Sequence, residues 1–393
     1  MYTQNTPVHV KLWHKDFWYM AIANLLITAS VYMFIPIAPL WLMEVKGFTH
    51  TETAMIMGVY GIGLYLLGGF CSYLVQTFRR YKIYIFSAIL MIAAVAGLYN
   101  IPSLGKDEET HVAINMALRF LFGASFGLAQ MVLSSTLIID TCESFKRTEA
   151  NYSASWFARL GFALGPIASI LIYENFGFNM VLAASVACIV MSVIFIESIS
   201  FPFKAPDDNI SKFSLDRFFL PYGTWLFINL LLTSFVVGMI FSHCRELMFY
   251  VMLMSGFLVA LVARKYVFEN AELQSETLSG LFLIGAALLM MLLRKQMIVA
   301  YVAPSFIGTG IGLVGSRFLL FYIKLSRHCQ RGTSQSSYFL AWESGIAAGL
   351  FVGYYSFYNN PQQLLSVALG VTVVALLMYR FFTHGWYMKH KNR

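Results

Sequence analysis

Apolar residues run along most of this chain in long blocks, and charged or Pro/Gly-rich stretches interrupt them repeatedly. A helix rises about 1.5 Å per residue, so about 20 consecutive apolar residues cross the roughly 30 Å hydrocarbon core of a bilayer. Walking from one interruption to the next predicts twelve membrane-spanning helices. The predicted spans are 17–43, 50–75, 83–100, 111–139, 149–174, 178–200, 218–242, 246–263, 276–293, 297–323, 335–358 and 362–383.

The composition agrees with an all-α membrane protein. Of the 393 residues 59% are hydrophobic and 12% charged, which is more apolar surface than a soluble core needs. The first span is longer than a signal-peptide core and no small-residue cleavage site follows it, so we expect it to be retained. The five cysteines are scattered and show no CxxC spacing. Neither a disulfide framework nor a metal site is expected, and no cofactor is predicted.

The placement of basic residues predicts the orientation. A net charge of +8 would suggest nucleic-acid binding in a soluble protein, but in a membrane protein the loops decide its meaning. With the N-terminus inside, nineteen of the 27 Lys and Arg residues fall on the cytoplasmic side, five on the other side and three within spans. Cytoplasmic loops of membrane proteins carry this excess. We therefore expect both termini in the cytoplasm, a bacterial inner-membrane location and no nucleic-acid partner.

Three matches across the loop 201–217 indicate an internal repeat. Asn24-Leu-Leu-Ile-Thr28 matches Asn229-Leu-Leu-Leu-Thr233, and the basic pair that follows span two matches the pair that follows span eight. The third match has a constant offset of 184 residues without a gap. It pairs Arg147 with Arg331, Asn151 with Gln335, Ser153 with Ser337, Gly161 with Gly345, and Gly165 with Gly349.

Internal repeats of this size are typical of secondary transporters. The matches predict an N-terminal six-helix bundle at 1–200, a cytoplasmic linker at 201–217 and a C-terminal six-helix bundle at 218–393. The glycines shared by the fifth and eleventh spans are spaced four residues apart, which lets helices approach closely. We expect them to serve packing and rocking rather than solute contact.

Spans four and five carry a family resemblance. Arg119-Phe-Leu-Phe-Gly123 resembles the fourth-helix Arg-x-x-x-Gly motif of the major facilitator superfamily, and Gly161-x-x-x-Gly165-Pro166 resembles its fifth-helix Gly-Pro motif. The stretch from Tyr32 through two prolines resembles the first helix of drug-exporter-like members. The resemblance implies two six-helix bundles around a central cavity, transport by alternating access and, from the Gly-Pro motif, export.

One family motif is degenerate. The loop after span two normally reads Gly-x-x-x-Asp-Arg-x-Gly-Arg-Arg, whereas here Val75 and Gln76 stand at the Asp-Arg positions. If that aspartate latches one state of the transporter, this chain latches otherwise or less firmly. The residues expected to serve conformational change are Arg79, Arg80, Asp140, Arg147, Gly161, Gly165, Pro166, Gly345 and Gly349.

Charged residues inside spans are the candidates for chemistry, because burying a charge in a lipid-facing helix costs about 2.5–3.5 kcal/mol. Arg119 would be a substrate anchor or a modulator of a carboxylate's protonation, or else a structural ion pair or carbonyl clamp. The offset of 184 places Arg159 and Glu343 at the same position of spans five and eleven. Glu343 would couple transport to protons, unless Arg159 or Arg317 neutralises it in a structural ion pair; the two readings stay open.

Small polar residues could line the cavity or hold helices together by hydrogen bonds. We favour the cavity for the pairs that recur in spans one and seven. The substrate or cavity candidates are Asn24, Thr28, Tyr32, Arg119, Asn229 and Thr233, and the coupling candidates are Glu343, Arg159 and Arg317.

These observations predict a secondary active transporter for a small solute, proton-coupled and exporting, and a monomer among membrane lipids. The alternatives are an uptake permease for an organic anion or other small metabolite, a membrane-embedded transferase, and a receptor-like or lipid-scrambling module. A phosphate-binding Gly-Lys-Ser/Thr loop is absent from the sequence, which argues against an ATP-driven pump. No connection between spans is longer than about 17 residues, which leaves no sizeable loop to house a His/Asp or paired-carboxylate site. An enzyme is therefore not expected.

Overall fold

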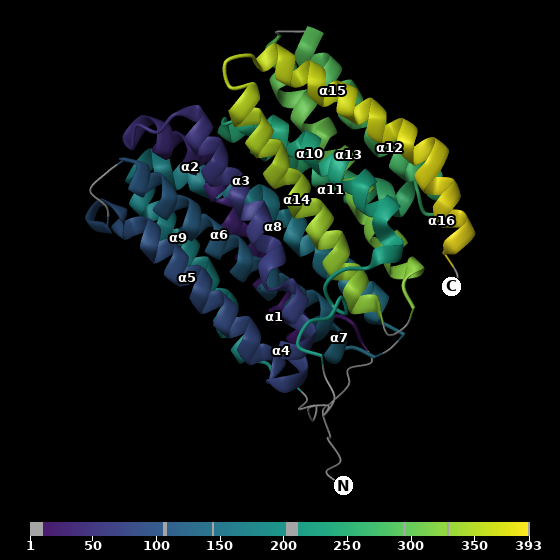
Figure 1. Ribbon diagram of the computed structural model, residues 1–393. Coiled ribbons are helices and arrows are strands. Elements are labelled where there is room, and N and C mark those ends of the chain that lie inside the picture. The colour runs from purple at the N-terminus through teal and green to yellow at the C-terminus, as the bar shows by residue number, and fades with distance from the viewer. Residues whose placement is uncertain are drawn as a thin grey trace.

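The computed structural model describes residues 11–104, 108–143, 145–201, 211–293, 296–327 and 330–391, and these are almost entirely helical (Figure 1). The helices before the linker are α1 (Lys15–Tyr32), α2 (Phe34–Leu40), α3 (His50–Leu66), α4 (Cys71–Thr77), α5 (Arg80–Leu104), α6 (Glu108–Val132), α7 (Ile138–Asp140), α8 (Arg147–Phe176) and α9 (Phe178–Glu197). Those after it are α10 (Thr224–His243), α11 (Leu247–Tyr266), α12 (Leu273–Leu293), α13 (Met297–Leu325), α14 (Arg331–Ser356), α15 (Pro361–Met378) and α16 (His384–His390).

Several predicted spans are made of consecutive pieces that continue one another. Short π-helices join or extend them, namely η1 (Trp41–Val45) after α2, η3 (Leu133–Leu137) after α6 and η6 (Tyr379–Thr383) after α15. The first span therefore runs over Lys15–Val45. Residues 202–210 of the expected linker lie outside the described residues, as do Lys106, Lys204, Arg294, Lys295, Cys329 and Arg393.

Eleven of the twelve predicted spans are confirmed as helices long and apolar enough to cross a membrane in the described part of the chain. The remaining one, predicted at 335–358, forms the helix α14, which falls short of that apolarity. Its first two turns bury Thr333, Ser334 and Gln335, and Glu343 follows near its middle. A polar helix is tolerated at this place because α14 packs against α3, α10 and α13, which shield it from lipid.

The helices form two groups with the same internal pairing. In Figure 1 the purple-to-blue helices lie on one side and the green-to-yellow helices on the other. Helix α1 packs on α8 and α3 on α6, while after the linker α10 packs on α14 and α11 on α13. The principal contacts between the groups join α3 to α14 and α8 to α11.

Glycines set the close approach within these pairs. A Cβ at Gly161 would lie 2.5 Å from the Leu25 carbonyl oxygen, and one at Gly165 would lie 2.6 Å from that of Ala29. Across the repeat, a Cβ at Gly345 or Gly349 would lie 2.5 or 2.1 Å from the carbonyl oxygens of Leu231 and Phe235, respectively. All four distances are far below ordinary carbon–oxygen contact, so the expected packing role of these glycines matches their surroundings.

The same contacts correct the register of the repeat in the first helix of each group. Leu25 and Leu231 occupy equivalent places, as do Ala29 and Phe235, and each pair is 206 residues apart. The Asn24–Asn229 match has an offset of 205 and is therefore one residue out. One residue turns a helix by about 100°, so the two asparagines point toward different neighbours.

Candidate functional site

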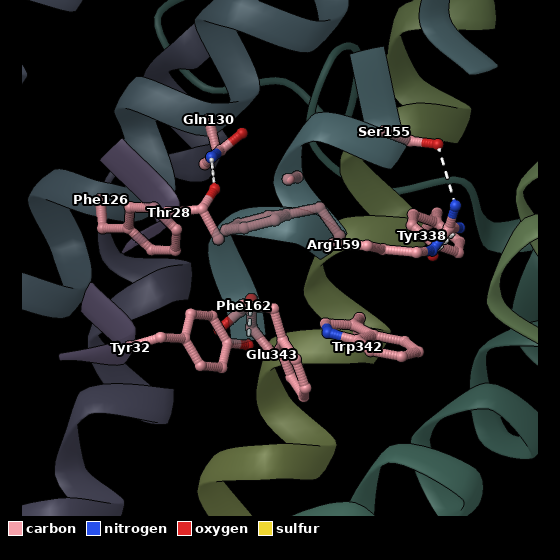
Figure 2. Close-up of a pocket in the computed structure, with 12 residues that line it drawn as sticks. Thr28, Tyr32, Phe126, Gln130, Ser155, Arg159, Phe162, Tyr338, Trp342 and Glu343 are labelled. Carbon is pink, nitrogen blue, oxygen red and sulfur yellow. Dashed lines mark hydrogen bonds between the residues drawn. The ribbon is translucent and has the colours of Figure 1, made fainter. Parts of the chain in front are cut away.

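A small cavity lies between the two groups of helices (Figure 2). Its volume is about 70 Å³, which is room for a few water molecules, whereas sites for drug-sized ligands measure about 300–1,000 Å³. A larger solute can enter only if the two groups move apart. The residues that line this central cavity are Thr28, Tyr32, Phe126, Gln130, Ser155, Ala158, Arg159, Phe162, Tyr338, Phe339, Trp342 and Glu343.

Glu343 is the acidic residue of the central cavity. Its side chain is buried, and it accepts a 2.8 Å hydrogen bond from the Tyr32 hydroxyl and a 3.2 Å hydrogen bond from the Tyr60 hydroxyl. Tyr32 belongs to α1 and Tyr60 to α3, so the carboxylate of α14 joins the second group of helices to the first. No cation among the described residues lies within ion-pair distance of Glu343.

Arg119 approaches this cluster through Tyr60. Its guanidinium is buried and lies 5.4 Å from the centres of the Tyr60 and Phe34 rings and 5.7 Å from that of Phe122. Two of its nitrogens, Nε and Nη1, have no hydrogen-bond partner among the described residues. The positive charge is therefore held by aromatic faces, and Tyr60 stands between it and Glu343.

Arg159 supplies the cation of the central cavity. Its Nη2 donates a 3.0 Å hydrogen bond to the Tyr338 hydroxyl, its Nη1 donates a 3.3 Å bond to the Ser155 hydroxyl, and its Nε has no partner among the described residues. Its guanidinium also lies 4.8 Å from the Trp156 ring centre. Figure 2 shows Arg159 pointing toward Tyr338, away from Glu343. The cavity thus presents opposite charges without joining them in a direct ion pair.

Of the four matched Asn and Thr residues, one lines the central cavity. Thr28 accepts a 3.1 Å hydrogen bond from Gln130, whose amide also donates 3.0 Å to the Asn24 side-chain oxygen. Asn229 instead donates 2.9 Å to the carbonyl of Ala375 on α15. The one-residue register shift explains the difference, because Asn24 faces α6 and Asn229 faces the outer helix α15.

Thr233 and Arg317 are bound within structural contacts. The Thr233 hydroxyl donates to the carbonyl of Asn229 in its own helix. Arg317 of α13 forms an ion pair with Glu276 of α12, a fully buried carboxylate, rather than with Glu343. Hydropathy placed Glu276 at the first position of a span, so its burial was not foreseen. Breaking such a buried pair is costly because the remaining charge has no partner.

Polar contacts close the end of the bundle that holds residues 77–80, 140–143, 145–147 and 211–221, here called the linker end. Asp216 accepts a 2.9 Å hydrogen bond from the Thr333 hydroxyl and a 3.2 Å bond from the Ser72 hydroxyl. It thereby connects α4, the linker and the first turn of α14, where a negative charge is favoured. Asp216 thus links separate elements at the linker end, as would be expected of the aspartate that the degenerate signature loop lacks.

Arg217 extends this network. Its backbone has φ of 58°, an unfavourable left-handed conformation, and its N–H donates 2.8 Å to the Thr333 hydroxyl. Its guanidinium lies 3.6 Å from Asp216, and nearby Arg80 forms an ion pair with Asp140. Burial, and next the charge of Arg80, lower the pKa of Arg217, whereas Asp216 raises it. Four charges therefore meet at the linker end.

The remaining gating candidates lie around this network. Arg79 precedes α5 at the exposed surface, and Arg147 begins α8 with its Nε buried and without a hydrogen-bond partner among the described residues. Pro166 is buried within α8 one residue after Gly165. Their role in conformational change stays a prediction.

Aromatic contacts close the opposite end of the bundle. His50, the first residue of α3, stacks on Tyr358 just beyond α14, with ring centres 5.5 Å apart. The Arg245 guanidinium lies 5.8 Å from the Tyr354 ring centre and 5.9 Å from that of Tyr358. The central cavity therefore lies between two layers of contacts, one at each end of the bundle.

Several residues of these sites were not among the candidates drawn from the sequence. Gln130 follows Arg119 by eleven residues, three helical turns, so a shared face with that arginine could have pointed to it. Tyr60, Tyr338 and Trp342 carry no comparable signal, because aromatic residues are frequent throughout the chain.

Comparison with known proteins agrees with these observations. No curated protein matches the chain by sequence. A solved bacterial homologue of the iron transporter ferroportin, in an outward-facing state, has 15% sequence identity and a TM-score of 0.68, covering 95% of this chain and 99% of that one. A solved point mutant of the nucleoside transporter NupG has 11% identity and a TM-score of 0.67, covering 93% and 100%. These similarities show the fold.

The sequence profile of the Major Facilitator Superfamily matches residues 20–350, which is most of the chain. The profile spans the Arg119 and Gly161 motifs that carried the resemblance, as well as the central cavity. The protein is therefore a multi-pass membrane transporter and not an enzyme. The chain belongs to the major facilitator superfamily.

Proposed function

We propose that this protein is a secondary active transporter that moves a small solute by alternating access and couples its movement to proton binding at Glu343. The observation that carries the proposal is the setting of Glu343, a buried carboxylate in the central cavity held by two tyrosine hydroxyls and by no cation among the described residues. A carboxyl group in such a place can gain a proton without breaking an ion pair, which a structural salt bridge would forbid.

Protonation of Glu343 would act directly on the contact between the two groups of helices. The ionised carboxylate accepts hydrogen bonds from Tyr32 and Tyr60, and bonds to a charged acceptor are about twice as strong as neutral ones. A bound proton removes that charge, weakening the hold of α14 on α1 and α3. Proton binding thereby favours separation of the helices and opening of the cavity.

The proposal includes a topology and a direction. Helix α14, the eleventh predicted span, also crosses the membrane and brings the number of crossings to twelve. Residues 1–200 and 218–393 form the two bundles, and the linker end faces the cytoplasm of a bacterial cell. The excess of basic residues in the loops supports that orientation. Export, a drug-exporter-like relationship and a monomeric state are further parts of the proposal; the Gly-Pro motif in α8 supports export.

A second candidate function is uptake of an organic anion. The observation that favours it is Arg159, whose guanidinium lines the central cavity with its Nε unpaired among the described residues. A carboxylate or phosphate group on the solute would satisfy that nitrogen. The aromatic walls, which include Phe162 and Trp342, would suit an apolar portion of the same molecule.

Transport measurements test the proposal. The protein would be reconstituted into vesicles containing a trapped pH indicator, and a library of small metabolites, organic anions and hydrophobic cations would be added outside. At least one solute is expected to change the internal pH and to accumulate when a pH gradient is imposed. Solute movement that ignores the pH gradient and moves no protons would contradict proton coupling while leaving transport itself intact.

The proposed orientation predicts the labelling of exposed side chains. Cysteines introduced at Lys212 and Lys324, both exposed near the linker end, should react with a membrane-impermeant reagent only after the cytoplasmic face is made accessible. A cysteine at Asn359, exposed at the opposite end, should react in intact cells. Labelling of either lysine position in intact cells would refute the topology.

Asp216 is predicted to hold the linker end closed. The Asp216→Ala change removes the acceptor of the Thr333 and Ser72 hydrogen bonds, each worth about 1.5–3 kcal/mol because the acceptor is charged. The fraction of protein with the linker end open should then rise about tenfold or more. Ser135 is buried and lies in contact with Gly332, so a cysteine at this position should react faster with a thiol reagent when the linker end opens. Lys212→Gln, an exposed change in the same segment, is the control and should leave the rate unchanged.

A further inference from the structure

A second, larger cavity opens between α8 and α11 at the linker end. Its volume is about 590 Å³, which falls within the range of sites for small molecules, roughly 300–1,000 Å³. Arg264 and Lys265 at the end of α11 and Arg317 of α13 give its wall three positive charges, and Glu269 gives it one negative charge. The function proposed above makes no use of this cavity.

The charges of this side cavity are incompletely balanced. Glu276 forms an ion pair with Arg317 and also attracts the Arg264 guanidinium, and Glu269 lines the cavity, so two carboxylates stand against the three cations Arg264, Lys265 and Arg317. Arg317 is 8% exposed, and its Nε has no hydrogen-bond partner among the described residues. Nη1 of Arg264 is likewise buried and has no hydrogen-bond partner among them. Buried donors of charged groups are costly when unpaired, so an anion fits this wall.

The surroundings of the cations define the kind of anion. Leu261 and Trp13 line the same cavity and are 43% and 52% exposed, on a surface that meets the hydrocarbon and head-group regions of a bilayer. The Arg264 guanidinium lies 3.9 Å from the ring centre of Tyr152, which orients its planar donors. A ligand that suits both walls has an acidic head group and apolar chains.

We propose that the side cavity binds the head group of an anionic phospholipid, with the phosphate on Arg264 and Lys265 and the acyl chains along Leu261. Basic pockets between membrane helices recognise such head groups, and a phosphate oxygen pair matches the donor fork of an arginine. The side cavity adjoins the central one through Trp156, which lines the side cavity and whose ring centre lies 4.8 Å from the Arg159 guanidinium. A bound lipid would therefore stabilise the contact between α8 and α11.

Thermal unfolding of the purified full-length protein in detergent tests the proposal. Phosphatidylglycerol is expected to raise the unfolding temperature in a saturable manner, and phosphatidylcholine at the same concentrations is not. Lys265→Gln should weaken the phosphatidylglycerol effect about tenfold in concentration, as should Arg264→Gln. Lys389→Gln removes an exposed positive charge from α16, outside the cavity, and should leave the effect unchanged.

Three results would overturn the proposal. The first is an equal response to the two lipids, and the second is an equal response of the Lys265 and Lys389 variants. The third is stabilisation by glycerol 1-phosphate as strong as that by phosphatidylglycerol and lost in the same variants, which would make the site one for a free anion. Because Lys265 is exposed, its variant decides the matter even if Arg264→Gln does not fold. None of these results depends on proton coupling at Glu343.

Discussion

Replacing Glu343 with glutamine is expected to abolish solute-driven proton movement while solute exchange continues. Glutamine has nearly the size of glutamate, and its carbonyl oxygen can still accept a hydrogen bond from Tyr32 or Tyr60. The side chain can no longer take up and release a proton. Cavity shape and helix contacts should therefore survive, and the step that links the proton to the conformational change should not.

The measurement compares two readouts in the same reconstituted vesicles. Net transport is followed by the internal pH indicator, and exchange is followed by the entry of labelled solute against unlabelled solute inside. Glu343→Gln should reduce the pH signal to that of protein-free vesicles and retain exchange. Glu174→Gln alters an exposed carboxylate at the end of α8 and should preserve both readouts. A Glu343→Gln protein that still moves protons with solute would place the coupling site elsewhere.

The sequence was a good guide to features that depend on one helix at a time. Hydropathy located eleven spans, and it placed Glu343 deep within α14 because depth follows from distance along the chain. The constant offset of 184 residues also put Arg159 and Glu343 at corresponding places, and both line the central cavity.

Contacts between helices were harder to foresee, since they depend on how each helix is rotated. Arg317 was a candidate partner for Glu343, yet its partner is Glu276, on a helix whose start was placed at that residue. Asn229 was a cavity candidate because it shares a helix face with Thr233, yet it faces α15, and its match to Asn24 is one residue out of register. A shift of one residue rotates the side chains by about 100° around the helix axis, and hydropathy does not resolve such a rotation in a helix that is apolar all round.

Connections between helices escaped prediction for another reason. Asp216 lies in the linker, where no periodic pattern fixes the direction of a side chain, and its partners Ser72 and Thr333 come from helices far away in sequence. The missing aspartate of the signature loop indicated that a latch had to be found elsewhere. Only the folded arrangement shows which residue stands near the start of α14.

Adding one methyl group at Gly349 is expected to destabilise the protein and to impair transport. In Gly349→Ala the new Cβ would lie 2.1 Å from the Phe235 carbonyl oxygen, 2.7 Å from the Met239 nitrogen and 2.8 Å from the Gly238 Cα. All three atoms belong to the backbone of α10, so no side chain can move aside. Helix α14 must shift away from α10, and overpacking of this kind costs about 1–3 kcal/mol of unfolding free energy.

A matched glycine separates this steric effect from the intrinsic effect of alanine. Gly370 lies in α15, and a methyl group added there would meet no atom within 4 Å, so alanine should leave stability unchanged or raise it by up to about 1 kcal/mol. Thermal unfolding of the two variants in the same detergent compares them directly. Equal stability would show that α14 does not pack on α10 as closely as described. Gly349 and Glu343 lie on the same helix, α14, and Glu343 accepts a hydrogen bond from Tyr32. A loss of stability in Gly349→Ala alone, together with weakened proton coupling, would therefore show that the α10–α14 contact also holds Glu343 near Tyr32.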